Sequence, residues 1–313
     1  MPLLTQGELN QTPILKLFTP FMSPNNIKRF ALVFVAFASV FLLVNYNLLL
    51  NKKKNQAEEN AKKINAILSE NFEHVERMLN FVGKKISQDT PELNLNKIHK
   101  IFVQSSNIYG PENILSWSLF DWVDFKGYET VSTMFGIRKD APYLAPERSY
   151  FNRGNELWKI AFSKAAIGNP SGVYIIPIGI QIDTKKHPRA GTVAAGISIK
   201  KVAGVIESSL ENDVRFMVLD QRDGRFVFGS YESEKYFGRI FRTSPQSTDD
   251  ENYIYKQNME QKYPYAILVG YDKKDFWREV FYSSLLLITQ VVGVAVCVIY
   301  VQRRKALFEK EGG

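Results

Sequence analysis

Two uncharged stretches, one near each end of the chain, dominate the pattern of hydrophobic and polar positions. The first covers residues 30–51 and the second covers residues 280–302. An α-helix rises about 1.5 Å per residue, so either stretch is long enough to cross a hydrocarbon layer of about 30 Å. The pattern therefore predicts two transmembrane helices, with residues 52–279 between them.

Basic residues next to these stretches indicate an orientation. They are Lys28, Arg29, Arg303, Arg304 and Lys305. Because cytoplasmic loops carry the excess of Lys and Arg, we expect residues 1–29 and 303–313 to be cytoplasmic tails. The first stretch could instead be a signal peptide, but it is longer than a signal h-region and no small-x-small cleavage site follows it. Residues 52–279 are therefore expected outside the cytoplasm.

The segment between the spans begins with a helical pattern and continues as short strands. Apolar residues recur three or four positions apart over residues 55–85, which predicts one long helix. From residue 91 the apolar runs become short, β-branched and aromatic, which is typical of strands. A helical stretch over residues 200–210 divides these strands into two groups. We therefore predict an α+β fold with two lobes in tandem, over about residues 90–199 and 212–271.

The clearest hairpin signal lies in the second group of strands. Residues 215–220 and 225–229 are two apolar runs joined by the turn Gln-Arg-Asp-Gly. An Asp-Gly pair supplies the positive φ angles that a tight turn needs. The sequence therefore predicts an antiparallel hairpin here.

Composition and charge exclude several functional classes. The chain carries 40 Lys and Arg against 32 Asp and Glu, and half of the net charge of +8 lies in the tails, so no nucleic-acid partner is expected. A single cysteine excludes a disulfide scaffold, and the three histidines are too far apart for helical zinc spacing. No phosphate-binding glycine loop and no nucleophile elbow occurs. We expect no metal, no cofactor, no catalytic residue and no enzymatic activity.

Several segments carry a resemblance to a known family. Residues 145–151 read Ala-Pro-Glu-Arg-Ser-Tyr-Phe, and Ile-Gly-Asn-Pro at 167–170 precedes a strand. A Gly-rich strand follows at 191–197, and Tyr-Pro-Tyr-Ala-Ile-Leu-Val-Gly stands at 263–270. In this order, between two spans, they resemble the extracytoplasmic double Cache (PDC-type) sensor domain of bacterial histidine kinases, diguanylate cyclases and chemoreceptors. The resemblance implies PAS-like lobes with antiparallel sheets and a bacterial inner-membrane location.

The resemblance also implies a ligand in the membrane-distal lobe, between its sheet and the loop with the Arg-x-Tyr-Phe signature. By position, Arg148 would bind a carboxylate, and Tyr143 and Tyr150 would supply an aromatic wall and hydroxyl groups. Further candidates for the pocket wall are Trp117, Asp121 and Tyr174. The alternative is structural: an arginine that anchors a loop through backbone carbonyls, and aromatic rings that belong to the core.

One position departs from the family. Where its amino-acid-binding branch offers an Asp to the ligand ammonium, this chain has Gly196 or its neighbours. An organic acid is therefore expected to fit better than an amino acid.

Three functions stay open at this stage. The first is a membrane-anchored sensor that binds a small anionic ligand, relays the signal through the second transmembrane helix and acts as a homodimer or on a separate signalling partner. The second is the truncated sensor half of a histidine kinase or diguanylate cyclase, because the eleven residues after the second span hold no output module. The third is an envelope scaffold or assembly protein. In each case the spans would contact membrane lipid.

Overall fold

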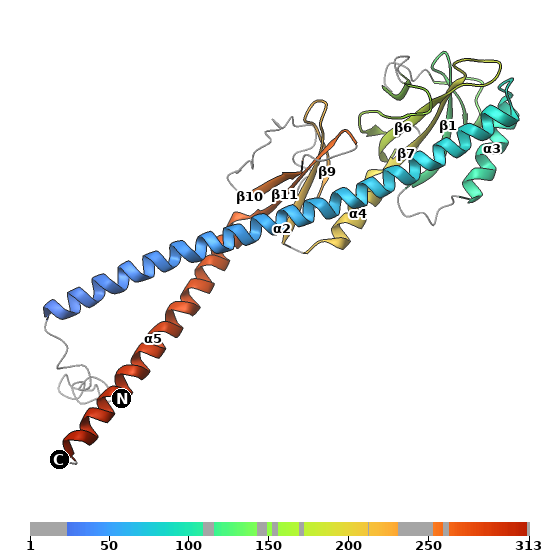
Figure 1. Ribbon diagram of the computed structural model, residues 1–313. Helices are drawn as coiled ribbons and strands as arrows, with labels where there is room; N and C mark the ends of the chain where they lie inside the picture. Colours follow the sequence, from blue (N-terminus) through green and yellow to red (C-terminus); the bar gives the residue numbers. More distant parts are fainter. Residues whose placement is uncertain are drawn as a thin grey trace, which may run out of the picture. The chain divides into compact units, whose positions relative to one another are not determined.

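The chain divides into two compact units. The computed structural model describes residues 24–108, 116–142, 149–151, 156–168, 172–211, 213–230, 253–258 and 263–311 (Figure 1). One unit consists of Met1–Lys53 with Lys273–Gly313, and the other consists of Lys54–Asp272. The first holds the two uncharged stretches and the second holds the sheets.

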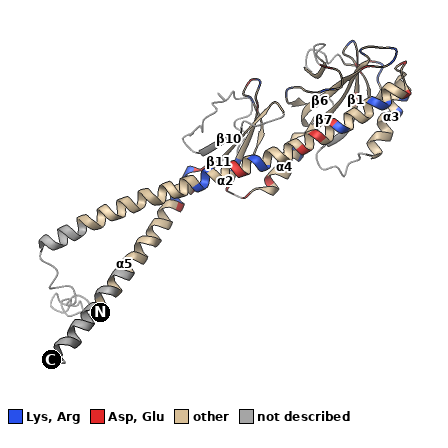
Figure 2. Ribbon diagram, in the orientation of Figure 1, with Lys and Arg blue, Asp and Glu red and all other residues tan. Residues whose placement is uncertain are grey.

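Four α-helices and one 3-10 helix are present among the described residues. They are α2 (Pro24–Asp89), α3 (Leu95–Ile108), η3 (Ser149–Phe151), α4 (Ile199–Ser209) and α5 (Lys273–Glu311). The 66-residue helix α2 joins the first uncharged stretch to the predicted helix over residues 55–85, so the long N-terminal helix is confirmed. Figure 2 shows that α2 carries charges of both signs beyond its uncharged part. Within the part of the chain that was described, α2 alone is long and apolar enough to cross a membrane.

Helices α2 and α5 contact each other within the first unit. The side-chain amide of Asn45 donates hydrogen bonds to the hydroxyl groups of Ser283, at 2.9 Å, and Ser284, at 2.6 Å. Lys53 and Glu279 form an ion pair with 3.4 Å between nitrogen and oxygen. Asn45 therefore has hydrogen-bond partners within the same chain.

The described strands form two antiparallel sheets, as the sequence predicted. The seven-stranded sheet has the order β3-β2-β1-β7-β6-β4, with β5 also paired to β6. Its strands are β1 (Ser116–Asp124), β2 (Glu129–Ser132), β3 (Gly136–Ile137), β4 (Ile160–Phe162), β5 (Ala166–Ile167), β6 (Tyr174–Ile182) and β7 (Gly191–Ser198). The four-stranded sheet, in the order β10-β11-β8-β9, consists of β8 (Val214–Asp220), β9 (Phe226–Gly229), β10 (Tyr253–Asn258) and β11 (Tyr265–Asp272).

The predicted apolar face of the long helix is buried against both sheets. Its members are Ile64, Leu68, Phe72, Val75, Leu79, Val82 and Ile86, and all of them belong to one core cluster. The same cluster contains Ile176, Ile178 and Ile180 of β6, and it continues through Phe216, Val218 and Ile267 of the second sheet. A single core along α2 therefore supports both lobes, and the apolar face packs on its own domain.

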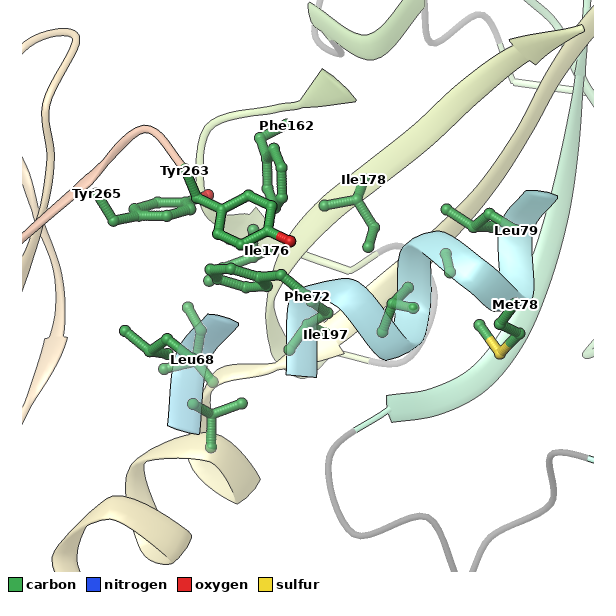
Figure 3. Packing of buried hydrophobic residues seen from close by; sticks show 14 of the residues in the cluster. Leu68, Phe72, Met78, Leu79, Phe162, Ile176, Ile178, Ile197, Tyr263 and Tyr265 are labelled. Atoms are coloured by element: carbon green, nitrogen blue, oxygen red, sulfur yellow. The ribbon is translucent and has the colours of Figure 1, made fainter. Parts of the chain in front are cut away.

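An aromatic cluster marks the place where this core passes from one sheet to the other (Figure 3). The ring of Phe72 lies edge-to-face with Phe162 of β4 at 5.0 Å between centroids and with Tyr263 at 4.9 Å. Tyr265 of β11 lies 5.5 Å from Phe72 and 5.7 Å from Phe162. Such pairs add to the free energy that burial itself contributes. The four residues join one helix and both sheets.

We predict that Phe72→Ala destabilises the folded protein strongly. Phe72 is 1% exposed, so truncation leaves a cavity at the junction of both sheets and is expected to lower the free energy of unfolding by about 3–5 kcal/mol. Phe81→Ala on the same helix is the matched control, since Phe81 is 37% exposed and its loss should cost less than about 1 kcal/mol. Urea unfolding of residues 52–279 measures both values. Equal costs for the two variants would contradict the arrangement of this core.

Candidate functional site

The candidate site lies on the face of the seven-stranded sheet that points away from α2. Successive side chains of a strand point to opposite faces, so the core isoleucines of β6 alternate with residues on the other face. On that second face Val123 of β1 and Ala194 of β7 form a small buried cluster with Tyr150 and Phe151 of η3. The short helix η3 therefore covers part of this face.

A cavity of about 270 Å³ opens beside this cluster. Its lining consists of Phe125, Phe151, Gln181, Arg189, Gly191 and Thr192. These residues come from the turn after β1, from η3, from the end of β6, from the β6–β7 loop and from the start of β7. The antiparallel register, which pairs Gln181 with Thr192 and Val123 with Thr192, brings the three strands together there.

Gln181 and Arg189 form the polar side of the cavity. Gln181 is only 7% exposed, and its side-chain oxygen accepts a 2.8 Å hydrogen bond from Nη1 of Arg189. Its side-chain nitrogen donates to the backbone carbonyl of Tyr150 at 3.3 Å. The amide is thus held from both ends, and it fixes the guanidinium of the exposed Arg189 at the cavity. A guanidinium has several donors and presents them in a planar fork that matches a carboxylate.

The buried hydroxyl group of Thr192 has no hydrogen-bond partner among the described residues. Its side chain is 0% exposed, and no described atom forms a hydrogen bond with Oγ1. Nearby, a Cβ atom added to Gly179 would lie 2.8 Å from Cγ2 of Thr192 and 3.1 Å from the ring of Tyr150. Glycine at this position therefore lets the ring lie close to the sheet. A buried hydroxyl without a partner carries a desolvation cost, which a bound polar molecule would offset.

The structure places the residues predicted from the sequence in different ways. Tyr150 is buried in η3 and contacts the sheet beside the cavity. Asp121 is half-buried in β1 and lies opposite Ala194, on the covered face. Arg148 and Tyr143 lie outside the described residues. The ligand-binding roles of these four residues stay predictions.

Trp117 and Tyr174 lie toward the other end of the sheet from the cavity. The backbone of Trp117 pairs with Gly196 in β7, about four residues or 13 Å along the strand from Thr192. Tyr174 begins β6, pairs with Ile167 and is half-buried. Burial raises the pKa of the Tyr174 hydroxyl, so it stays a neutral hydrogen-bonding group at physiological pH. Tyr174 is not among the described residues that line the cavity, and the ligand-binding roles of Trp117 and Tyr174 stay predictions.

Sequence reasoning missed Gln181, Arg189, Thr192 and Phe125. Gln181 did leave a signal, because it is the one polar amide in the otherwise apolar run Tyr174–Ile182. Arg189 left none, since it lies in a polar loop with other basic residues, where solvent exposure is the usual state.

We predict that Thr192→Val stabilises the ligand-free protein. Valine has the same shape without the unpaired hydroxyl, so the free energy of unfolding should rise by about 1 kcal/mol. Thr184→Val is the matched control. The hydroxyl of Thr184 donates to the carbonyl of Pro91 at 3.0 Å and accepts from the amide of His187 at 3.1 Å, so its loss should destabilise by about 1 kcal/mol. Urea unfolding measures both. Destabilisation by Thr192→Val would mean that the Thr192 hydroxyl has a partner in the folded protein.

Comparison with known proteins rests on structure. No protein-family model and no curated protein sequence matches the chain. The sensory domain of the Campylobacter jejuni chemoreceptor Tlp3 (CcmL), solved with isoleucine bound, is similar with a TM-score of 0.56 and 11% identity, over 74% of this chain and 98% of that one. The ligand-binding domain of the amino acid chemoreceptor PctC of Pseudomonas aeruginosa PAO1, solved with GABA, has a TM-score of 0.51 and 8% identity, over 70% and 99% of the two chains.

An extracellular ligand binding receptor from Desulfohalobium retbaense DSM5692 is similar over 69% of this chain, with a TM-score of 0.52 and 16% identity. This chain spans 39% of the length of that receptor. At these identities the likeness concerns the fold. The chain therefore has the fold of the double Cache (PDC-type) sensor domains found outside the membrane in bacterial receptors.

Proposed function

We propose that this chain is a membrane-anchored sensor that binds a small organic anion on the covered face of the seven-stranded sheet. The observation that carries the proposal is the cavity in which Arg189, Gln181 and Thr192 meet. A fold shared with ligand-binding sensory domains supports the same role.

The chemistry of the lining favours a small carboxylate. Arg189 would bind the carboxylate through its guanidinium, and the hydroxyl of Thr192 would donate a hydrogen bond to it. Phe125 and Phe151 would contact the apolar part of the ligand. A volume of about 270 Å³ lies just below the usual range for drug-sized ligands, so a compact molecule is favoured. We further propose that Arg148, Tyr143 and Tyr150 of the signature loop complete the site.

An organic acid fits the described lining better than an amino acid. Tlp3 was solved with isoleucine, and an α-ammonium group needs an acceptor. Among the described residues that line this cavity, Arg189 is the single charged side chain, and none is a carboxylate. An ammonium would therefore meet positive charge at this cavity.

We propose that residues 52–279 lie outside the cytoplasm of a bacterium, with lobes at about 90–199 and 212–271, and that both uncharged stretches cross its inner membrane. The signal would leave through the second span, because α5 begins at Lys273, directly after the last residue of β11. A shift of this strand would thus act on the helix without an intervening linker. The receiver would be a second copy of the chain or a separate signalling partner.

A scaffold role is the second candidate. Met134, Phe135 and Ile137, in and before β3 at the edge of the seven-stranded sheet, are apolar and exposed. Clustered exposed apolar residues mark docking surfaces in many proteins. In a scaffold, a protein partner would bind at this edge, and the cavity would bind no ligand.

We predict that an organic acid raises the melting temperature of residues 52–279. A ligand at about 100 times its dissociation constant adds roughly 2.7 kcal/mol, or about 5–10 °C for a domain of this size. The panel should also contain amino acids, amines and purines. Arg189→Gln should abolish the shift because it removes the charge at the cavity. Lys185→Gln, an exposed cation of the same loop, should preserve it.

The outcomes of this panel are distinct. A shift with amino acids alone would overturn the assignment of ligand class. Cooperative melting without any shift would favour the scaffold. A shift that persists in Arg189→Gln and vanishes in Arg148→Gln would move the anion site to the signature loop.

We predict that the C-terminal end of the chain lies on the cytoplasmic side of the inner membrane. In spheroplasts, a membrane-impermeant maleimide should label Lys126→Cys and should label Lys310→Cys only after lysis. The unsubstituted chain is the control, because its single cysteine, Cys297, lies inside the second uncharged stretch. Labelling of Lys310→Cys before lysis would show that α5 does not end in the cytoplasm.

A further inference from the structure

Arg222, in the turn between β8 and β9, reaches across to the seven-stranded sheet. Its Nη1 atom donates a 2.6 Å hydrogen bond to the backbone carbonyl of Phe162, the last residue of β4. A neighbouring contact runs in parallel, since Lys164 pairs with Asp223 of the same turn at 2.8 Å. The predicted Asp-Gly hairpin turn is therefore a contact point between the two sheets.

Within the second sheet, the guanidinium of Arg222 is bound by the carboxylate of Asp220. Its Nε and Nη2 atoms bond the two carboxylate oxygens of Asp220 at 2.9 Å and 2.6 Å. Asp220 is only 3% exposed, and it pairs in register with Tyr265 of β11. Bidentate pairing with a buried carboxylate leaves a guanidinium little freedom, so its third contact, with Phe162, is geometrically determined.

The carbonyl of Phe162 also accepts a hydrogen bond from the hydroxyl of Ser149, at 2.9 Å. Ser149 begins η3, and the amide of the next residue, Tyr150, donates to the hydroxyl of Ser163 at 3.2 Å. The end of β4 therefore forms hydrogen bonds both with η3, which covers part of the cavity face, and with the β8–β9 turn of the second sheet. A displacement of η3 must change the hydrogen bonding at the carbonyl of Phe162, because this carbonyl accepts from both Ser149 of η3 and Arg222.

The helix η3 is also bonded to the lining of the cavity. The side-chain nitrogen of Gln181 donates to the carbonyl of Tyr150 in η3, and its side-chain oxygen accepts from Arg189. A continuous series of contacts thus runs from the cavity to β8. We call this series the relay; its members are Gln181, Tyr150, Ser149, Phe162, Arg222 and Asp220.

We propose that Arg222 is the residue through which the state of the cavity reaches the second sheet, because its guanidinium bonds the carbonyl of Phe162 and the carboxylate of Asp220 at once. The inference rests on the proposed function, in that the cavity is the site whose state is read. When a ligand engages Gln181 or Arg189, η3 shifts and the carbonyl of Phe162 moves. Arg222 transfers that movement to the β8–β9 turn and to β11, which leads into α5.

Hydrogen exchange of the full chain in lipid nanodiscs tests the relay without any ligand. The reporters are the amides of Asp220, Gln221 and Gly224, which donate to Arg225, Pro264 and Asp220 respectively. Gln181→Leu breaks the relay at the cavity and should speed exchange of these amides about three- to tenfold, as expected for the loss of one net hydrogen bond.

The decisive comparison is a double-mutant cycle. In the background of Arg222→Gln, the relay is already open, and Gln181→Leu should change exchange of the reporters by less than about twofold. Arg225→Gln is the matched control: Arg225 lies in the same turn, its side chain is 54% exposed, and it pairs with Asp223 at 3.4 Å, outside the relay. In that background Gln181→Leu should keep its full effect.

Two results would overturn the proposal: no effect of Gln181→Leu on the reporters, or an equal effect with and without Arg222. If Gln181→Leu fails to fold, Ser149→Ala removes a central bond of the relay, and the same two criteria apply. The ligand panel reports separately on the proposed function. If Gln181→Leu changes exchange of the reporters only when Arg222 is present, but no ligand raises the melting temperature, the relay is supported and the proposed function is not. If a ligand raises the melting temperature but the exchange effect does not depend on Arg222, the relay alone is overturned.

Discussion

The burial of one face of α2 is the constraint on which the rest of this structure depends. A single helix supplies an apolar row to both sheets, and Phe72 lies at the point where its neighbours change from β4 to β11. Each fully buried side chain of this kind stabilises the fold by about 1.5–3 kcal/mol. Because both lobes share the helix, they share a core, and neither sheet can shift along α2 without repacking the aromatic cluster.

The same packing leaves the opposite face of the first sheet to the short helix η3 and the cavity. The two-residue period of a strand sends the isoleucines of β6 toward α2 and leaves Gly179 and Gln181 on the other face. Small residues there, Gly179 and Ala194, let η3 approach closely, while Gln181 and Thr192 bring polar atoms to a place that water hardly reaches. A polar group in such a place stabilises the fold only if it has a partner.

The junction of the two sheets combines rigidity with directed polar contacts. Burial raises the pKa of the Tyr265 hydroxyl, so this ring stays neutral and apolar in character beside the pair of Arg222 and Asp220. The pair is oriented by its geometry, because both carboxylate oxygens of Asp220 accept from the guanidinium. The core thus keeps the two lobes together, and a small number of polar bonds connects their sheets. Strand β11 is followed directly by α5 in the chain.

Local periodicity in the sequence determined the long helix, its buried face, the α+β class, the two groups of strands and the Asp-Gly turn, because each depends on neighbours within a few residues. The resemblance to a known family, rather than periodicity, pointed to the signature loop, and Tyr150 of that loop lies beside the cavity. Only the tertiary structure joined Gln181 to Tyr150, gave Asn45 its partners in α5 and set Arg222 against Phe162. These contacts span 31 to 239 residues, and they follow from strand register and helix packing. No local pattern encodes such distances, so the chemistry of the site became visible only when the strands were paired.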